Sequence, residues 1–220
     1  MEGLRHSCTN ENLDIIVRGL DVNFNDTILA IGGSGHPGLA LLEYAKKVMV
    51  VDTNPTQIDF IGRIVECIRT GNYEGFHARD EFGSEDGYFS GTISRNTAVA
   101  RKKLMEKYFG VDWRLDKIRA KLGEFEILPT GNIFDLGQRI VFDKAYLSNA
   151  VGYSNDFSYE EFIKFVDKLR VGSLVYITDA SCRLLLEQTI NRHGVKLARD
   201  EKLSNVSEGD LWEHSVYVRV

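Results

Sequence analysis

Residues 28–57 read ILAIGGSGHPGLALLEYAKKVMVVDTNPTQ, and this stretch decides the fold. The run 27–31 (TILAI) predicts a buried strand that leads into a glycine-rich turn. Residues 39–47 then predict a helix, and residues 48–51 predict a second strand. A strand, a glycine turn, a helix and a second strand in this order indicate a nucleotide-binding α/β unit.

The turn and the residue after the second strand are candidates for binding an adenosine cofactor. Glycines let backbone amides approach a polar or anionic ligand closely. Asp52 lies 20 residues after Gly32 (52 − 32), where a carboxylate can accept hydrogen bonds from ribose hydroxyls. The alternative is that Asp52 caps the helix beginning near Pro55. The residues assigned to this part of the site are Gly32, Gly33, Ser34, Gly35, Asp52, Thr53 and Gln57.

The same alternation of apolar runs and helical patterns continues to the end of the chain. It predicts helices at 55–70, 159–169 and 183–193 and strands at 126–128, 144–148, 174–178 and 195–198. Residues 215–220 (SVYVRV) have a period of two, which predicts a half-exposed antiparallel strand. We expect a Rossmann-like α/β fold, with a seven-stranded, mostly parallel sheet, helices on both faces and an antiparallel last strand.

The connection between the second helix and the third strand, roughly 55 residues, is too long for a simple helix-to-strand loop. Residues 71–91 predict an irregular loop, and 95–109 and 115–122 predict helices. We expect a single domain over 1–220, with an N-terminal segment (1–26) and a helical cap inserted at about 71–122. The alternative is helical padding on one edge of the sheet.

Composition and charge narrow the class of protein. The 220 residues are 43% hydrophobic and 27% charged, as in a soluble globular protein. The net charge of −5 gives no basic excess, so we expect no nucleic-acid partner. No apolar run approaches the ~20 residues of a membrane span, and residues 1–8 do not resemble a signal peptide. We therefore expect no transmembrane segment and a cytoplasmic location.

Cysteine and histidine spacing indicates neither a disulfide framework nor a metal site. The three cysteines are far apart and form no CxxC pair, so we expect buried thiols. Four histidines outside the turn show no HxH or HExxH spacing. These are His6, His77, His193 and His214.

Polar residues also follow the third and fourth predicted strands. Asn132 and the amide of Ile133 are placed to bind an adenine edge, unless they only form a Gly-Asn turn. Asn149 ends the fourth strand at the carboxyl edge, where open α/β sheets bind ligands. Tyr153 and Asp156 follow it and are our candidate catalytic residues, with a polar loop cap as the alternative.

Two cofactors are compatible with the turn. Residues 33–38 satisfy the GxGxxG pattern of dinucleotide-binding enzymes, so an NAD(P)-binding oxidoreductase is one interpretation. However, seven predicted strands leave little of the chain for a second nucleotide-binding half or a substrate domain. An antiparallel last strand is also typical of the seven-stranded fold that binds S-adenosylmethionine (SAM). We therefore predict that SAM is the cofactor.

The motifs resemble those of the BtaA-like SAM transferases, which move a 3-amino-3-carboxypropyl group. The specific ones are IGGSGHPGLALL (31–42) and VMVVDTNPTQIDF (48–60), and the similarity extends over about residues 27–220. Upstream, Glu11 matches an acidic position of that family. The resemblance implies a SAM-dependent transferase that uses a small-molecule or lipid-like acceptor.

The sequence also departs from related families. Ala30 stands where class I methyltransferases usually carry an acid, near the end of the first strand. His36 and Pro37 replace the Asp-Asn-like pair that is common in BtaA-like turns. These departures leave open which group of SAM is transferred, so a SAM-dependent methyltransferase is the alternative function. The second alternative is an NAD(P)-binding oxidoreductase or a non-catalytic SAM-binding module.

Overall fold

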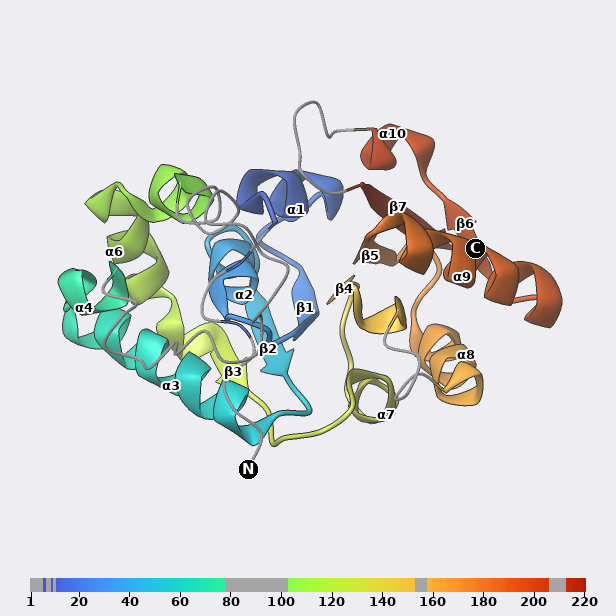
Figure 1. Cartoon of the computed structure of the whole chain (residues 1–220), viewed down its shortest axis with the longest axis horizontal. Coiled ribbons are helices and arrows are strands. Elements are labelled where there is room, and N and C mark those ends of the chain that lie inside the picture. The colour runs from blue at the N-terminus through green and yellow to red at the C-terminus, as the bar shows by residue number, and fades with distance from the viewer. Residues whose placement is uncertain (1–5, 7–8, 10, 78–102, 153–157, 206–212) are drawn as a thin grey trace, which may run out of the picture.

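A single seven-stranded sheet forms the centre of the chain (Figure 1). This computed structural model describes residues 6, 9, 11–77, 103–152, 158–205 and 213–220. The strands are β1 Thr27–Ile31, β2 Lys47–Val51, β3 Phe125–Ile127, β4 Lys144–Ser148, β5 Leu174–Thr178, β6 Leu197–Arg199 and β7 His214–Arg219. The longer helices are α1 Leu13–Gly19, α2 His36–Leu42, α3 Pro55–Thr70, α6 Asp112–Ala120, α8 Tyr159–Lys168 and α9 Ala180–His193. The shorter ones are α4 Tyr73–His77, α7 Ile133–Gly137, α10 Glu201–Ser204, η2 Leu122–Glu124 and η3 Ala150–Gly152.

The strand order is β3-β2-β1-β4-β5-β7-β6. β1 to β5 pair in parallel, and β7 pairs antiparallel with both β5 and β6. The direction of winding therefore reverses between β1 and β4. A reversal of this kind opens a crevice at the carboxyl ends of the strands, where α/β sheets bind ligands. The predicted fold class is confirmed.

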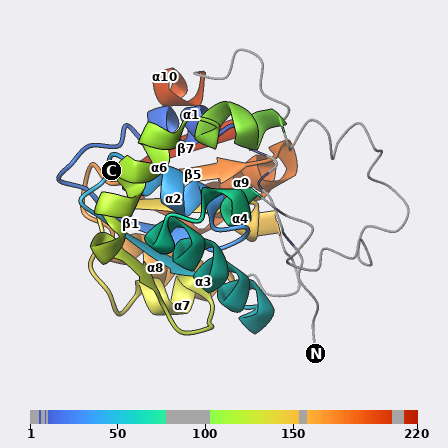
Figure 2. The ribbon, with the colours of Figure 1, turned by 90° about the vertical axis from the view of Figure 1, so that its left-hand side faces the viewer.

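Helices cover both faces of the sheet, because alternate strand residues point to opposite sides. On β1, Ile28 and Ala30 belong to one core cluster, and Leu29 belongs to the other. The first cluster takes in residues of α1, α2, α3 and α6, and the second takes in residues of α7, α8 and α9. Figure 2 shows α3, α4 and α6 lying in front of the sheet on the first side.

Two helices begin three residues earlier than their apolar patterns predict. α2 begins at His36, because Pro37 fits the first turn and Gly35 adopts the left-handed N-cap with φ 76°. α9 begins at Ala180, because the Asp179 carboxylate accepts a hydrogen bond from the Ser181 amide. Side-chain periodicity reports the buried face of a helix but carries less information about the first turn.

The last strand is buried on both faces, so the expectation of a half-exposed strand was wrong. Five of its six residues are buried, with only Val218 partly exposed. β7 lies between β5 and β6, and Val216 and Tyr217 point into opposite core clusters. An interior strand covered by helices on both sides shows no polar face, even though its sequence alternates.

The predicted cap is described only in part, since residues 78–102 lie outside the described residues. Tyr73–His77 form α4, where we predicted an irregular loop. Residues 103–109 are helical, and Tyr108 and Phe109 are buried in the first core cluster. The described part of the insertion therefore packs on the main body. Its role as a cap over an acceptor stays a prediction.

Candidate functional site

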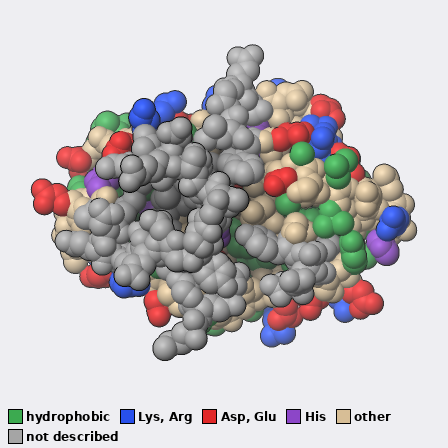
Figure 3. Space-filling model, viewed as in Figure 1, with side chains coloured by type: hydrophobic (Ala, Val, Ile, Leu, Met, Phe, Trp, Pro, Cys, Tyr) green, Lys and Arg blue, Asp and Glu red, His purple; other side chains and the backbone are tan. Residues whose placement is uncertain are grey.

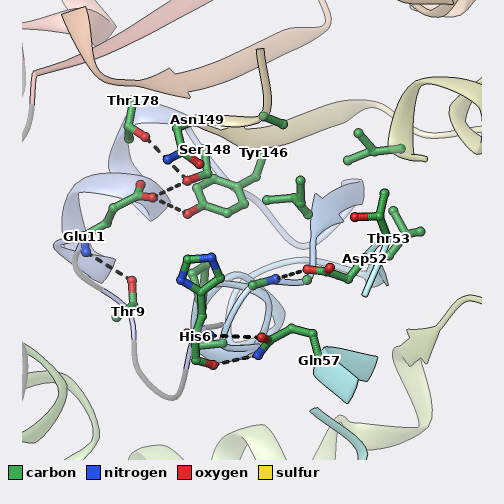
Figure 4. A pocket seen from close by; sticks show the side chains of 18 of the residues that line it. His6, Thr9, Glu11, Asp52, Thr53, Gln57, Tyr146, Ser148, Asn149 and Thr178 are labelled. Carbon is green, nitrogen blue, oxygen red and sulfur yellow. Dashed lines mark hydrogen bonds between the residues drawn. The ribbon is translucent and has the colours of Figure 1, made fainter. Parts of the chain in front are cut away.

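A pocket of about 200 Å³ lies at the carboxyl edge of the sheet (Figure 4). Its walls come from the ends of β1, β2, β4 and β5, the turn before α7 and the N-terminal segment. Nine of the ten residues that we assigned to cofactor binding line it. They are Gly32, Gly33, Ser34, Asp52, Thr53, Gln57, Asn132, Ile133 and Asn149. Residues far apart in the sequence are thus brought together by the sheet topology.

Asp52 joins the second strand to the glycine turn. One carboxylate oxygen accepts a hydrogen bond from the Gly33 amide at 2.9 Å, and the other accepts one from the Asn54 amide at 2.9 Å. The alternative that Asp52 caps the next helix was wrong, because Asn54 caps α3 by accepting from the Thr56 amide. Asp52 remains partly exposed at the pocket wall.

The four residues of the turn have different roles. A Cβ at Gly32 would lie 2.9 Å from Ile61 Cδ1 and 3.2 Å from the Val51 carbonyl, so packing against α3 and β2 requires glycine there. Gly35 does not line the pocket, because it packs against Ile61 and Ile64 on α3. Ser34 does line it, with 3% of the residue exposed. Among the described residues, its buried hydroxyl has no hydrogen-bond partner.

Gln57 connects the pocket to the N-terminal segment. Its Nε2 donates to the carbonyl of His6 at 2.6 Å, and its Oε1 accepts from the amide of His6 at 3.0 Å. This two-bond pairing resembles a step of β-ladder and fixes the backbone at residue 6 over the pocket. We predicted that Gln57 binds the cofactor. In the structure, its amide group forms hydrogen bonds with the protein's own backbone.

Asn132 is both a pocket residue and a helix cap. Its Oδ1 accepts from the Phe134 amide at 2.9 Å, which begins α7, and its Nδ2 donates to Glu161 at 3.3 Å. Phe134 is buried against the rings of Phe162 and Phe165. The structural role that we gave as the alternative for Asn132 is therefore present, although Asn132 also lines the pocket. The cap also holds Ile133 at the pocket wall.

A carboxylate from the N-terminal segment lies inside the pocket. Glu11 is 4% exposed, and its Oε1 accepts hydrogen bonds from the Tyr146 hydroxyl at 2.8 Å and the Ser148 hydroxyl at 2.6 Å. Burial, and then the charge of Glu11, raise the pKa of Tyr146 well above its ordinary value. The phenol therefore keeps its proton and acts as a hydrogen-bond donor to the carboxylate.

Two pocket residues have a backbone that non-glycine residues rarely adopt. Ser148 has φ 50° and Asp179 has φ 80°, at the carboxyl ends of β4 and β5. Strain of this kind, of order 1–3 kcal/mol per residue, concentrates at ligand-binding sites. Asn149 beside them is exposed, and its carbonyl accepts from the Cys182 thiol at 3.6 Å. Burial raises the pKa of Cys182 to about 11, so this thiol stays protonated at neutral pH.

Several pocket residues were missed by sequence reasoning. His6 was set aside because it has no metal-ligand spacing, yet it lines the pocket. Tyr146, Thr178 and Asp179 could have been found by the rule that selected Asn149, since they lie near the carboxyl ends of parallel strands. Thr9 also lines the pocket, but it does not follow a predicted strand, so this rule could not have found it. The candidate catalytic residues Tyr153 and Asp156 lie outside the described residues.

The described part of the chain contains no cluster of three or more His, Cys, Asp or Glu side chains that could hold a metal ion. Within the same residues, no helix combines the length and the apolar character that crossing a membrane requires.

Comparison with known proteins finds the fold but no family. No protein-family model matches the chain, and no curated protein sequence matches it. Among solved structures, it is similar to precorrin 8W decarboxylase from Methanobacterium thermoautotrophicum, with 13% identity and a TM-score of 0.53. That match covers 94% of this chain and 89% of the other.

Two further solved structures are similar to this chain. TrmN from Thermus thermophilus is 11% identical with a TM-score of 0.52, over 94% of this chain and 48% of TrmN. MtNAS, in complex with MTA and tNA, is 11% identical with a TM-score of 0.50, over 94% and 58%. At such identities the likeness shows the fold alone, which is a Rossmann-like α/β fold with a seven-stranded, mostly parallel sheet.

Proposed function

We propose that this protein is a SAM-dependent transferase that binds SAM in the pocket at the carboxyl edge of β1, β2 and β4. The observation that carries the proposal is the gathering of nine predicted cofactor residues around one pocket, within a fold that SAM-dependent enzymes use. The pocket lies at the reversal of strand order, where the topology favours ligand binding.

The pocket walls fit the parts of SAM. Asp52 stands at the end of β2, where its carboxylate can accept from the ribose hydroxyls while the Gly33 amide holds it in place. Ile133 offers a backbone amide and an apolar side chain to the adenine ring. The Ser34 hydroxyl, buried and without a partner among the described residues, gives the turn a free polar group toward a ligand.

The charges of the pocket favour SAM over a dinucleotide. The described lining contains Glu11, Asp52 and Asp179 and neither lysine nor arginine. Such a wall suits a ligand with a sulfonium and an ammonium group, and it is unfavourable for the two phosphates of NAD(P). All seven strands of the described chain belong to one sheet, so the described residues contain no second nucleotide-binding half.

We infer that the group transferred is 3-amino-3-carboxypropyl, because the two specific motifs of the BtaA-like transferases lie on the pocket wall at the glycine turn and Asp52. SAM supplies a sulfonium whose bond to carbon breaks with the electron pair leaving on a neutral thioether. The protein's contribution is then to orient the ligand, exclude water and align the acceptor with one sulfonium carbon. Methyl transfer is the second candidate, favoured by the fold that the chain shares with methyltransferases.

We propose a small-molecule or lipid-like acceptor. On the face seen in Figure 3, the described Lys and Arg side chains are interspersed with Asp and Glu around the rim, and they form no continuous basic surface. A phosphate backbone needs several cationic contacts at once, and the described side chains of this face do not offer them as one surface. The fold itself does not exclude one, and RNA belongs among the acceptors to be tested.

The nucleoside released from SAM identifies the transferred group. We expect the protein, incubated with SAM and a cell extract of metabolites and lipids, to release methylthioadenosine, measured by mass spectrometry. Release of S-adenosylhomocysteine (SAH) instead would contradict aminocarboxypropyl transfer and support methyl transfer. Binding of SAM with neither product would support the non-catalytic alternative. A parallel incubation with total RNA tests the nucleic-acid acceptor.

A further inference from the structure

Three loops lie at the amino edge of the sheet, which is the edge opposite the pocket. They lead into β1, β4 and β5, which are neighbouring parallel strands. Each loop carries one of the three most exposed large apolar side chains of the described residues. These are Phe24, Val141 and Val171, with 76%, 73% and 79% of the residue exposed. Figure 2 shows the loop between α1 and β1 at the left of the molecule. Exposed apolar side chains that gather on one face mark an interaction surface.

A groove of about 550 Å³ lies between these loops. Val141, Val171 and Asn25 are among the residues that line it. Phe24 is the neighbour of Asn25 in the chain, so its exposed ring stands beside the groove. The same face therefore carries both an exposed aromatic ring and a recess with apolar walls.

The loop that carries Phe24 is held in place by hydrogen bonds of its own. The Asn23 amide donates to Asp26 at 2.7 Å, and the Asn25 amide donates to Asn23 Oδ1 at 3.0 Å. Asp26 also forms a buried ion pair with Lys144 on β4, at 2.8 Å. The ring is thus presented to solvent on a fixed loop, so little conformational freedom is lost when a partner covers it.

The charges of this face indicate which partner fits it. The loop before β1 exposes an acid, Asp21, and the groove is lined by two exposed cations, Lys46 and Arg170. A second copy of the chain that inserts this loop into the groove brings its acid toward these cations. The groove is also lined by the acids Asp26 and Asp143, so it offers no continuous cationic surface to a nucleic acid or an anionic membrane.

We propose that two copies of this chain associate through their amino edges, with Phe24 of each copy in the groove of the other, between Val141 and Val171. A ring and a recess on one face form a self-complementary surface, which a two-fold symmetric dimer requires. The amino edge faces away from the pocket, so both pockets stay open in the dimer. This inference goes beyond the proposed function, and its test does not depend on SAM binding.

Analytical ultracentrifugation over a range of protein concentrations tests the dimer. We expect the wild-type protein to reach the mass of two chains. Phe24→Asp places a charge in the apolar recess at both contacts, and we expect it to raise the dissociation constant of the dimer about 100-fold or more. Leu184→Asp is the matched control, because Leu184 is also an exposed apolar residue but lies on α9, outside the groove. The control should form the dimer as the wild-type protein does.

A mixture of two variants tests the pairing of the ring with the groove. Phe24→Asp loses the ring but keeps the groove, whereas Val171→Lys keeps the ring but alters the groove. We expect each variant alone to be monomeric at concentrations where the wild-type protein is a dimer. Their equimolar mixture should form dimers, because one contact is intact and the other joins opposite charges.

Both substitutions replace exposed side chains, so the midpoint of urea unfolding should stay that of the wild-type monomer. A wild-type protein that is monomeric at every concentration, or a dimer that Phe24→Asp leaves intact, overturns the proposal. A mixture of the two variants that remains monomeric overturns the insertion of Phe24 into the partner's groove.

Discussion

Replacing Asp52 by alanine is expected to weaken the binding of SAH by about 1.5–3 kcal/mol, which is about 10- to 150-fold in Kd. The substitution removes the charged acceptor that we assign to the ribose hydroxyls. It also leaves the Gly33 and Asn54 amides without their present acceptor, so the turn loses its fixed position. Calorimetry with SAH measures the change.

Asp59→Ala is the matched control for this experiment. Asp59 lies on α3, seven residues after Asp52, and its side chain is exposed and outside the pocket. We expect its SAH affinity to equal that of the wild-type protein. Equal SAH affinity of Asp52→Ala and the control would remove Asp52 from the cofactor site.

Replacing Phe165 by alanine is expected to lower the free energy of unfolding by about 3–5 kcal/mol. Phe165 is fully buried on α8, and its ring contacts those of Phe134, Phe142 and Phe162. Its removal would leave a cavity between α7, α8 and the sheet. Because α7 begins at the Asn132 cap, we expect the adenine side of the pocket to loosen as well.

Urea denaturation measures this loss, with Lys164→Ala as the control. Lys164 is the neighbour of Phe165 on α8, but its side chain is exposed. We expect the control to change the free energy of unfolding by no more than about 0.5 kcal/mol. A Phe165→Ala variant as stable as the control would mean that the aromatic cluster does not hold α7 and α8 to the sheet.

The sheet could be predicted because local signals and tertiary structure agree. The strands at 27–31, 144–148 and 174–178 and the helix at 55–70 occur with the predicted bounds. The three strands are buried apolar runs. The helix has one buried apolar face, and it begins at Pro55 after the Asn54 N-cap and ends before Gly71. The pocket followed from the same reasoning, since parallel strands bring their carboxyl ends to one edge.

The contribution of the N-terminal segment could not be predicted from periodicity. His6, Thr9 and Glu11 lie before the first element and line the pocket. His6 and Glu11 are held there by hydrogen bonds with residues far along the chain, and Thr9 accepts one from the Glu11 amide. The Glu11–Tyr146 contact spans 135 residues and depends on how α1 packs over the sheet. Only the resemblance to BtaA-like proteins drew attention to Glu11. The burial of β7 escaped prediction for a similar reason, because it depends on which strands lie beside it.

The central claim is that this pocket binds SAM and not a dinucleotide, and a calorimetric titration of the wild-type protein with SAH and with NADH tests it most directly. We expect saturable binding of SAH at one site per chain, abolished or strongly weakened in Asp52→Ala, and no measurable heat with NADH. Saturable binding of NADH together with no binding of SAH would contradict the assignment.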